Sequence, residues 1–372
     1  MSARFLTAVS GRAFNMRDRF GREIDYMRIS VIDSCNLNCY YCNPQDNNKN
    51  CQAINILSIK KVLCIVRAAT RLGITHFRLT GGEPLLHPQI DEMVSQIKKI
   101  PGVRSVSLTT NAVLLAQHAK QLNEAGIDSI NVSLDTIDAS EYEHITKKPL
   151  LDKVEHGIDA AIECGIRVKI NAVLTPQTDV VALTRYASKK GTDIRFIEMM
   201  PVGEGHINGV EPYKKVIGAL LEVYGTPCRI DTENREEINS GYNNADNGPA
   251  EYYSFHGLDI RVGLIQAIHG KFCDTCNRIR VTADGRLMPC LGSSVTMDLV
   301  PDSCEFTDDL EKDFVIVQAL KAAIKAKPGC HNFNDNAVTY TKTTETKTVE
   351  TKTTELKAAE VNAARNMSRI GG

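Results

Sequence analysis

Three cysteines near the start of the chain have a spacing that suits metal chemistry. Cys35, Cys39 and Cys42 lie in the stretch DSCNLNCYYCNP with the pattern C-x3-C-x2-C. A closed metal site usually has four ligands, so three thiols indicate a site with one open position. Three thiolates can hold three irons of a [4Fe–4S] cluster and leave the fourth iron free for a substrate. Zinc with a fourth ligand from elsewhere in the chain is the alternative.

A second incomplete triplet lies in the last third of the chain. Cys273 and Cys276 in FCDTCNRIR are followed by Cys290 in MPCL, which gives the spacing C-x2-C-x13-C. No fourth ligand is evident, although His269 or another cysteine could complete a zinc site here. Two open three-cysteine sites in one chain form a more specific pattern than either site alone.

Composition and charge narrow the class of protein. The chain has 372 residues, of which 42% are hydrophobic and 24% charged, as in soluble globular proteins. Its net charge of -1 argues against a nucleic-acid binder dominated by phosphate contacts. No apolar run is long enough to span a membrane. Twelve cysteines in a chain with no secretory signal indicate metal binding or catalysis rather than disulfides.

Alternating strand and helix patterns must position these cysteines. Strands are expected at 25–33, 74–80, 103–109, 127–134, 166–173 and 193–199, with amphipathic helical stretches between them. Repeated strand–helix units predict a parallel sheet with right-handed crossovers. Six units favour an α/β fold built as an incomplete (βα)6 TIM-like barrel, and an open doubly wound sheet is the alternative.

The pattern changes after residue 228. Shorter strands, a hairpin turning at Asp284-Gly285 and a helix near 308–327 predict a smaller C-terminal α+β domain that binds the second cluster. The Thr/Lys/Glu repeat at 341–355 has little apolar surface to bury and predicts a linker. The expected divisions are an N-terminal arm (1–20), the barrel (21–228), the C-terminal domain (229–335) and a linker with a Gly-Gly tail (336–372).

Cations interrupt four of the apolar strands. They are Arg28, Arg78, Lys169 and Arg195. A buried cation needs a partner, and internal ion pairs with Asp33 or Glu198 are one interpretation. The other is a basic barrel interior that binds a polyanion such as a nucleoside triphosphate. The chain has no G-x-x-x-x-G-K-[ST] loop, so a nucleotide would not be held as in P-loop proteins.

Polar residues also follow the expected strand ends, where parallel βα barrels place their chemistry. The first strand is followed by the cysteine triplet and the second by GGEP, from Gly81 to Pro84. This arrangement resembles the radical S-adenosylmethionine superfamily, in which C-x3-C-x2-C carries an aromatic residue before the last cysteine, here Tyr41. The superfamily implies that the open iron chelates S-adenosylmethionine and that GGEP receives its amino group.

The chain resembles the GTP 3′,8-cyclase family within that superfamily, from about residue 16 to 335 and at its last residues. The stretches FRLTGGEP, SLTTN, INVSLD and RFIEMM, the second triplet and the terminal Gly-Gly carry the resemblance. It implies that Cys35, Cys39 and Cys42 hold one [4Fe–4S] cluster and that Cys273, Cys276 and Cys290 hold another. The implied S-adenosylmethionine positions are Tyr41, Gly82, Ser133 and Met200. The implied GTP positions are Arg28, Arg78, Thr109, Lys169, Arg278 and Arg280, with Arg278, Arg280, Gly371 and Gly372 also implied in catalysis.

The resemblance further implies a reaction and partners. The reaction is a radical lyase step that converts GTP to (8S)-3′,8-cyclo-7,8-dihydroguanosine 5′-triphosphate, the first step of molybdenum cofactor biosynthesis. A flavodoxin- or ferredoxin-like electron donor, cyclic pyranopterin monophosphate synthase as the next enzyme, and a homodimer are implied. Neither nucleic acid nor a membrane is an expected partner. The expected location is the cytoplasm, or the mitochondrial matrix if residues 1–15 are a targeting peptide.

Three positions depart from the family pattern. Ser34 stands where the family usually has Arg, Asn43 where it has Met, and Ala112 where it has Gly. None of them removes a cluster ligand or a phosphate contact. The rival functions are another radical S-adenosylmethionine enzyme with an auxiliary cluster and a non-catalytic zinc-binding module.

Overall fold

A computed structural model describes residues 16–42, 54–202, 209–230, 248–293, 296–299, 310–331 and 333. The strands are β1 (Tyr26–Ser30), β2 (His76–Thr80), β3 (Ser105–Thr110), β4 (Ser129–Ser133), β5 (Val168–Leu174), β6 (Asp193–Glu198), β7 (Cys228–Ile230), β8 (Glu251–Ser254), β9 (Val262–Ile265), β10 (Arg278–Val281), β11 (Arg286–Met288) and β12 (Met297–Asp298). The helices are α1 (Ile59–Thr70), α2 (Ile90–Lys98), α3 (Leu115–Glu124), α4 (Ala139–Thr146), α5 (Leu151–Glu163), α6 (Val180–Lys189), α7 (Pro212–Tyr224) and α8 (Leu310–Ala326). Two 3-10 turns, η1 (Pro84–Leu86) and η3 (Cys273–Thr275), follow β2 and precede β10. Within these ranges, every helix is too short or too polar to span a membrane.

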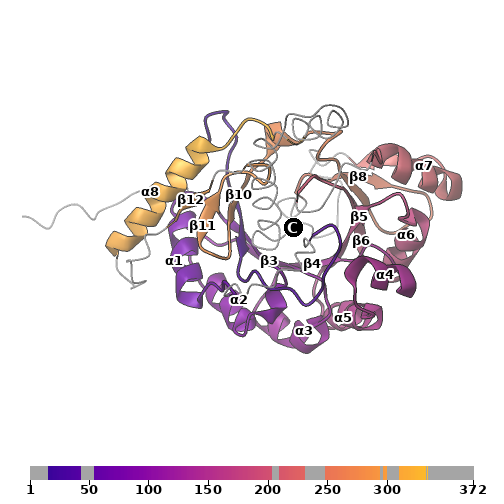
Figure 1. Cartoon of the computed structure of the whole chain (residues 1–372), viewed down its shortest axis with the longest axis horizontal. Coiled ribbons are helices and arrows are strands. Elements are labelled where there is room, and N and C mark those ends of the chain that lie inside the picture. Colours follow the sequence, from indigo (N-terminus) through magenta and orange to yellow (C-terminus); the bar gives the residue numbers. More distant parts are fainter. Residues whose placement is uncertain are drawn as a thin grey trace, which may run out of the picture.

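The described strands form one open sheet in the order β12-β11-β10-β1-β2-β3-β4-β5-β6-β9-β8-β7. Strands β1 to β6 pair in sequence order and are all parallel. The sheet is curved, and the helices between these strands lie along its outer side (Figure 1). The prediction of an incomplete six-unit barrel is confirmed, and the doubly wound alternative, which needs helices on both faces, is wrong.

The C-terminal part extends the barrel sheet at both edges. Strand β10 pairs in parallel with β1, and β9 pairs in parallel with β6. The predicted hairpin is confirmed, because β10 and β11 are antiparallel on either side of the turn at Asp284-Gly285. The expected helix near 308–327 is α8, which packs against α1. These elements therefore continue the barrel instead of building a second sheet.

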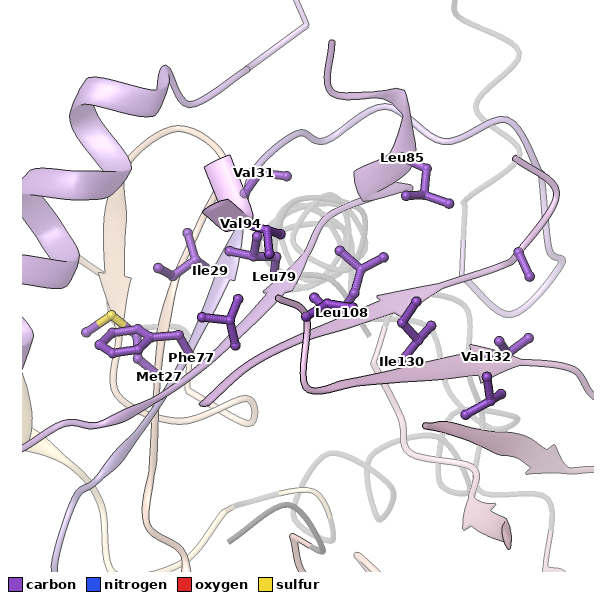
Figure 2. Packing of buried hydrophobic residues seen from close by; sticks show 14 of the residues in the cluster. Met27, Ile29, Val31, Phe77, Leu79, Leu85, Val94, Leu108, Ile130 and Val132 are labelled. Carbon is purple, nitrogen blue, oxygen red and sulfur yellow. The ribbon is translucent and has the colours of Figure 1, made fainter. Parts of the chain in front are cut away.

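Side chains alternate along each strand between two faces of the sheet. One is an apolar core face, and the other is an inner face that lines the interior of the barrel. Met27 and Ile29 of β1 and Phe77 and Leu79 of β2 are fully buried, and Figure 2 shows them packed together with Val94 and Leu108. Successive side chains of a strand point to opposite faces, so the residues between them face the interior of the barrel. The strand cations occupy those intervening positions.

The loops after β1 and β2 are locked together by two glycines. The backbone N–H of Gly82 donates to the carbonyl of Ile32 at 2.7 Å, and the N–H of Glu83 donates to the carbonyl of Ser34 at 2.8 Å. A Cβ at Gly82 would overlap the carbonyl oxygen of Ser34. Only glycine allows the two backbones to approach this closely. The pair Gly81-Gly82 therefore fixes the start of the first cysteine loop.

We expect Gly82→Ala to destabilise the fold by about 1–3 kcal/mol or more, because a backbone oxygen cannot move aside as a flexible side chain can. Gly218→Ala is the matched control: it lies inside α7 with open space where the added methyl group would lie, and we expect a gain of about 0.5–1 kcal/mol. Urea unfolding followed by circular dichroism measures both. Equal stability of Gly82→Ala and the parent would contradict the close approach.

Candidate active site

The polar residues at the carboxyl ends of β2 and β3 meet around one buried carboxylate. Glu83 is 1% exposed, and its side chain accepts hydrogen bonds from the Thr110 hydroxyl at 2.6 Å, the Asn111 N–H at 2.7 Å and the Leu85 N–H at 3.0 Å. Burial raises the pKa of Glu83 to about 7, although these hydrogen bonds oppose the shift. Glu83 thus ties the loop after β2 to the loop after β3.

Asn111 and Asp135 hold the first cysteine loop to this rim. Asn111 Nδ2 donates to Asn36 Oδ1 at 2.7 Å, and Asn36 directly follows Cys35 in the chain. On the other side of the loop, the Tyr41 hydroxyl donates to Asp135 Oδ2 at 2.5 Å. Asp135 in turn accepts from the Val173 N–H at 2.8 Å. The loop carrying Cys35, Cys39 and Cys42 is therefore anchored to β3, β4 and β5.

Desolvation and nearby negative groups raise the pKa of the thiols in the first triplet. The pKa of Cys35 is raised to about 12, chiefly by desolvation and to a lesser extent by the nearby Glu83 and Cys42. Burial followed by the charge of Asp135 raises the pKa of Cys42 to about 11. The Leu37 N–H donates to Cys35 Sγ at 3.5 Å, a contact of the kind that stabilises cluster sulfurs. The thiols would lose their protons on metal binding, so the set fits an iron–sulfur cluster.

Among the described side chains, no three His, Cys, Asp or Glu residues converge closely enough to hold a single metal ion. A [4Fe–4S] cluster does not need such convergence, because each thiolate binds a different iron. His269, considered above as a zinc ligand, bonds through Nδ1 to Glu198, and Glu198 also accepts the Ile268 N–H at 2.7 Å. His269 thus joins the loop after β9 to the end of β6.

The candidate S-adenosylmethionine residues occupy the same end of the barrel. Gly82 and Tyr41 belong to the loops just described, and Ser133 is the exposed last residue of β4. Met200 follows β6 and packs against a small cluster of Val202, Ile268 and Phe333. These four residues therefore lie at or just after the carboxyl ends of β1, β2, β4 and β6.

Three arginines lie side by side across the inner face of the sheet. Arg28 of β1 is in register with Arg78 of β2 on one side and with Arg280 of β10 on the other. Burial, and then the charge of Arg280, hold the pKa of Arg28 well below its usual value, and Arg78 and Arg278 add to the effect. Burial and Arg278 lower the pKa of Arg280 to about 10. Like charges directly opposite each other are destabilising, so this row is suited to an anion.

Further polar groups extend the row across the sheet. Arg78 donates through Nε to the Tyr26 hydroxyl and through Nη1 to Thr109 Oγ1 at 3.4 Å. Lys169 is 1% exposed on β5, where it lies in register with Asn131 of β4. Arg195 donates to Asn171 Oδ1 at 2.9 Å.

The carboxylates considered as ion-pair partners bind other groups. Asp33 accepts the Asn55 N–H at 3.1 Å and its side-chain amide at 2.6 Å. Glu198 binds the loop after β9, as described above. The structure therefore favours the interpretation of a basic interior over internal ion pairs with these two residues.

The second triplet lies at the other end of the same strands. Cys276 precedes β10, and the N–H of Tyr26, the first residue of β1, donates to the carbonyl of Asn277 at 3.3 Å. Cys290 follows β11, which runs back antiparallel to β10. The first triplet follows the carboxyl end of β1, so the two triplets lie beyond opposite ends of this strand, with the arginine row between them.

Two cations that the sequence patterns did not reveal hold the second triplet. Lys327 is 2% exposed, and its ammonium donates to the carbonyls of Arg278 at 2.8 Å and Pro289 at 3.0 Å. Buried Arg22 donates to the carbonyl of Cys273 at 2.7 Å. Burial alone would raise the pKa of Cys276, but Arg278 and Lys327 outweigh it and lower the pKa to about 6. These charges favour the thiolate of Cys276, so the second set also fits a cluster. No sequence motif marks Arg22 or Lys327, because their partners are backbone carbonyls far away in the chain.

Some predicted residues lie outside the described ranges. They are Asn43, Gly371 and Gly372, together with the N-terminal residues 1–15 and the repeat at 341–355. Ala112 is described, and it has a left-handed backbone with φ of 63°. A glycine would adopt that conformation without strain, which gives a physical reason for the family preference at this position.

Comparisons with known proteins agree with this geometry. The family models for the Radical SAM superfamily and for Molybdenum Cofactor Synthesis C match residues 29–183 and 192–333. A GTP 3′,8-cyclase of Clostridium perfringens (strain SM101 / Type A) is 36% identical over 321 residues, which cover 86% of this chain and 95% of the relative. A GTP 3′,8-cyclase of Thermodesulfovibrio yellowstonii is 38% identical, with coverage of 76% of this chain and 87% of the relative.

Among solved structures, Streptococcus suis SuiB bound to precursor peptide SuiA has a TM-score of 0.56 at 17% identity. The match covers 82% of this chain and 67% of that chain, and it shows the shared fold alone. The relatives identify the family more closely than the fold does. The chain belongs to the GTP 3′,8-cyclase family of radical S-adenosylmethionine enzymes, which acts in molybdenum cofactor biosynthesis.

Proposed function

We propose that this chain converts GTP to (8S)-3′,8-cyclo-7,8-dihydroguanosine 5′-triphosphate. Its two cysteine triplets and its arginine row would each bind a different part of the reacting molecules. The observation that carries the proposal is the placement of the triplets beyond opposite ends of β1, with Arg280, Arg28 and Arg78 in register between them. A triphosphate supplies negative charge that is complementary to this row of cations. One substrate can then contact the arginines with its triphosphate while its guanine faces the second triplet and its ribose faces the first.

The first triplet, Cys35, Cys39 and Cys42, would hold a [4Fe–4S] cluster that, when bound, supplies the electron for cleavage of S-adenosylmethionine. The protein's part is to position the cofactor through Gly82, Tyr41, Ser133 and Met200. Tyr41 is itself oriented by its hydrogen bond to Asp135. The close backbone approach at Gly82 keeps the binding loop rigid against the cysteine loop.

The second triplet, Cys273, Cys276 and Cys290, would hold a cluster whose open iron anchors the guanine. Arg278 and Arg280 lie on β10 just beyond this triplet, where they can contact the base and the phosphates. Arg28, Arg78, Thr109 and Lys169 would bind the triphosphate on the inner face. The barrel excludes water from the radical chemistry, as expected for a cofactor of this kind.

Partners and location belong to the same proposal. The clusters need an external reductant, for which a flavodoxin- or ferredoxin-like protein has suitable chemistry. The product would pass to cyclic pyranopterin monophosphate synthase, and the chain would work as a homodimer. Reduced cysteines, which the clusters require, favour the cytoplasm.

We predict about eight irons per chain, because two [4Fe–4S] clusters hold four each. Replacing Cys35, Cys39 and Cys42 by Ala should abolish cleavage of S-adenosylmethionine. Replacing Cys273, Cys276 and Cys290 should spare part of the cleavage and stop formation of the cyclised product. Iron and sulfide analysis of anaerobic protein and mass analysis of the products measure these effects. One zinc and no iron in such protein would contradict the proposal.

We predict that Arg28→Ala, Arg78→Ala and Lys169→Ala each weaken GTP binding by roughly ten- to a hundred-fold, because a charge-assisted contact contributes about 1.5–3 kcal/mol. Exposed Arg104 on the loop before β3 provides the control Arg104→Ala, which should bind GTP as the parent does. Equilibrium dialysis under anaerobic conditions gives the dissociation constants.

The proposed role of Gly371 and Gly372 rests on the family resemblance of the final residues. We expect the double variant Gly371→Ala/Gly372→Ala to cleave S-adenosylmethionine at the parent rate and to lose most of the cyclised product, because side chains would obstruct a close backbone approach to substrate. Replacing 341–355 by a Gly/Ser linker of equal length should leave both reactions intact. Full cyclase activity in the double variant would remove these glycines from the mechanism.

A further inference from the structure

Cys330, a cysteine outside the two triplets, lies beside the second triplet. Cys330 is exposed and belongs to the segment 327–331, which directly follows α8. Neither the cluster assignment nor the substrate site uses it. The contacts of its neighbours in the chain show where the segment lies.

Lys327, at the start of the segment, bridges two of the ligand-bearing stretches. Its ammonium donates to the carbonyl of Arg278, two residues after Cys276, and to the carbonyl of Pro289, the residue before Cys290. The side chain is almost fully buried while it does so. The beginning of the segment is thus fixed between Cys276 and Cys290.

Arg22 ties the middle of the segment to the remaining ligand. Its Nη1 donates both to the carbonyl of Cys273 at 2.7 Å and to the carbonyl of Gly329 at 3.1 Å. Its Nη2 donates to the carbonyl of Pro328 at 2.6 Å. A single guanidinium nitrogen therefore joins Cys273 to the residue immediately before Cys330.

His331, the residue after Cys330, is also held in place by its neighbours. The His331 ring bonds through Nε2 to the carbonyl of Ala267 at 2.7 Å. A Cβ at Gly292, two residues past Cys290, would lie 2.8 Å from the Cβ of His331.

We propose that Cys330 is a reversible fourth thiolate of the second cluster, which binds its open iron while GTP is absent and leaves when GTP arrives. This inference rests on the proposed function, because it requires a cluster with an open iron at this triplet. The exchange is a ligand substitution without electron transfer. The iron–sulfur bond forms as the thiol proton leaves to solvent, and it breaks as a purine nitrogen of GTP binds and the sulfur takes up a proton.

Such a ligand protects the cluster between turnovers. An open iron exchanges with water and chelators, and an exposed thiolate on a fixed segment can occupy that position. Because the segment is held by Arg22, Lys327 and His331, only the Cys330 side chain needs to move. The thiolate competes with GTP for one coordination position, so it weakens GTP binding as the cost of protection.

The first test is differential alkylation of wild-type holoenzyme with iodoacetamide, read by mass spectrometry at Cys330. Exposed Cys228 of β7, at the opposite end of the sheet order, is the internal control. We expect Cys330 to react at least about tenfold more slowly without GTP than with it, because a metal-bound thiolate is withdrawn from alkylation. Cys228 should react equally in both conditions. Equal reactivity of Cys330 with and without GTP, or protection only when GTP is present, would overturn the proposal.

The second test compares Cys330→Ala with the control Cys228→Ala. If the thiolate occupies the iron in about nine of ten molecules, its removal should tighten GTP binding about tenfold. Cys330→Ala should also release iron to a chelator faster in the absence of GTP. Unchanged GTP affinity and unchanged iron release would overturn the proposal.

Iron analysis separates this proposal from the proposed function. About eight irons in the parent and in both variants, with GTP bound, would show that the two clusters and the substrate site are present. Failure of the Cys330 tests on such protein would remove only the fourth ligand. Absence of iron from the parent would instead contradict the proposed function itself.

Discussion

The parallel pairing of β1 with β10 is the constraint on which the rest of the site depends. Tyr26 lies opposite Arg278, and Arg28 lies opposite Arg280, although these strands are far apart in the chain. The loop after β1 carries the first triplet, and the loop before β10 carries the second. Two strands that run in the same direction place these loops beyond opposite ends of the sheet. The interior between them becomes a site with a cysteine triplet at each end.

The pairings of β1 with β10 and with β2 align three arginines, whose like charges repel one another. The opposite faces of their strands offset this cost, because Met27, Phe77 and Ile279 are almost completely buried. Full burial of each such side chain contributes about 1.5–3 kcal/mol. The apolar face therefore holds the strands in register whatever occupies the inner face.

The second triplet is held in place by buried cations that bind backbone carbonyls, as well as by its own loop. Arg22 and Lys327 are both buried, and both donate to carbonyls next to the ligand residues. Their positive charges also lie near thiols that must become thiolates, so structural support and electrostatic support come from the same side chains. The segment that carries Lys327 follows α8, which packs against α1 of the barrel. The N-terminal and C-terminal regions of the chain thus meet at this triplet.

The sequence by itself determined the local features of this protein. The β-rich segments that alternate with helical patterns predicted the six barrel strands, and cysteine spacing predicted two incomplete triplets. Charge within apolar strands indicated either a basic interior or internal ion pairs. Each of these signals lies within a few residues, so periodicity and spacing reveal it. Only the tertiary structure decided that the triplets lie beyond opposite ends of β1 and that Arg28, Arg78 and Arg280 form one row. It also decided that Arg22, Lys327 and Cys330 gather at the second triplet. Those arrangements depend on strand register and on hydrogen bonds between distant segments, and no local pattern encodes which distant backbone a strand or a cation will meet.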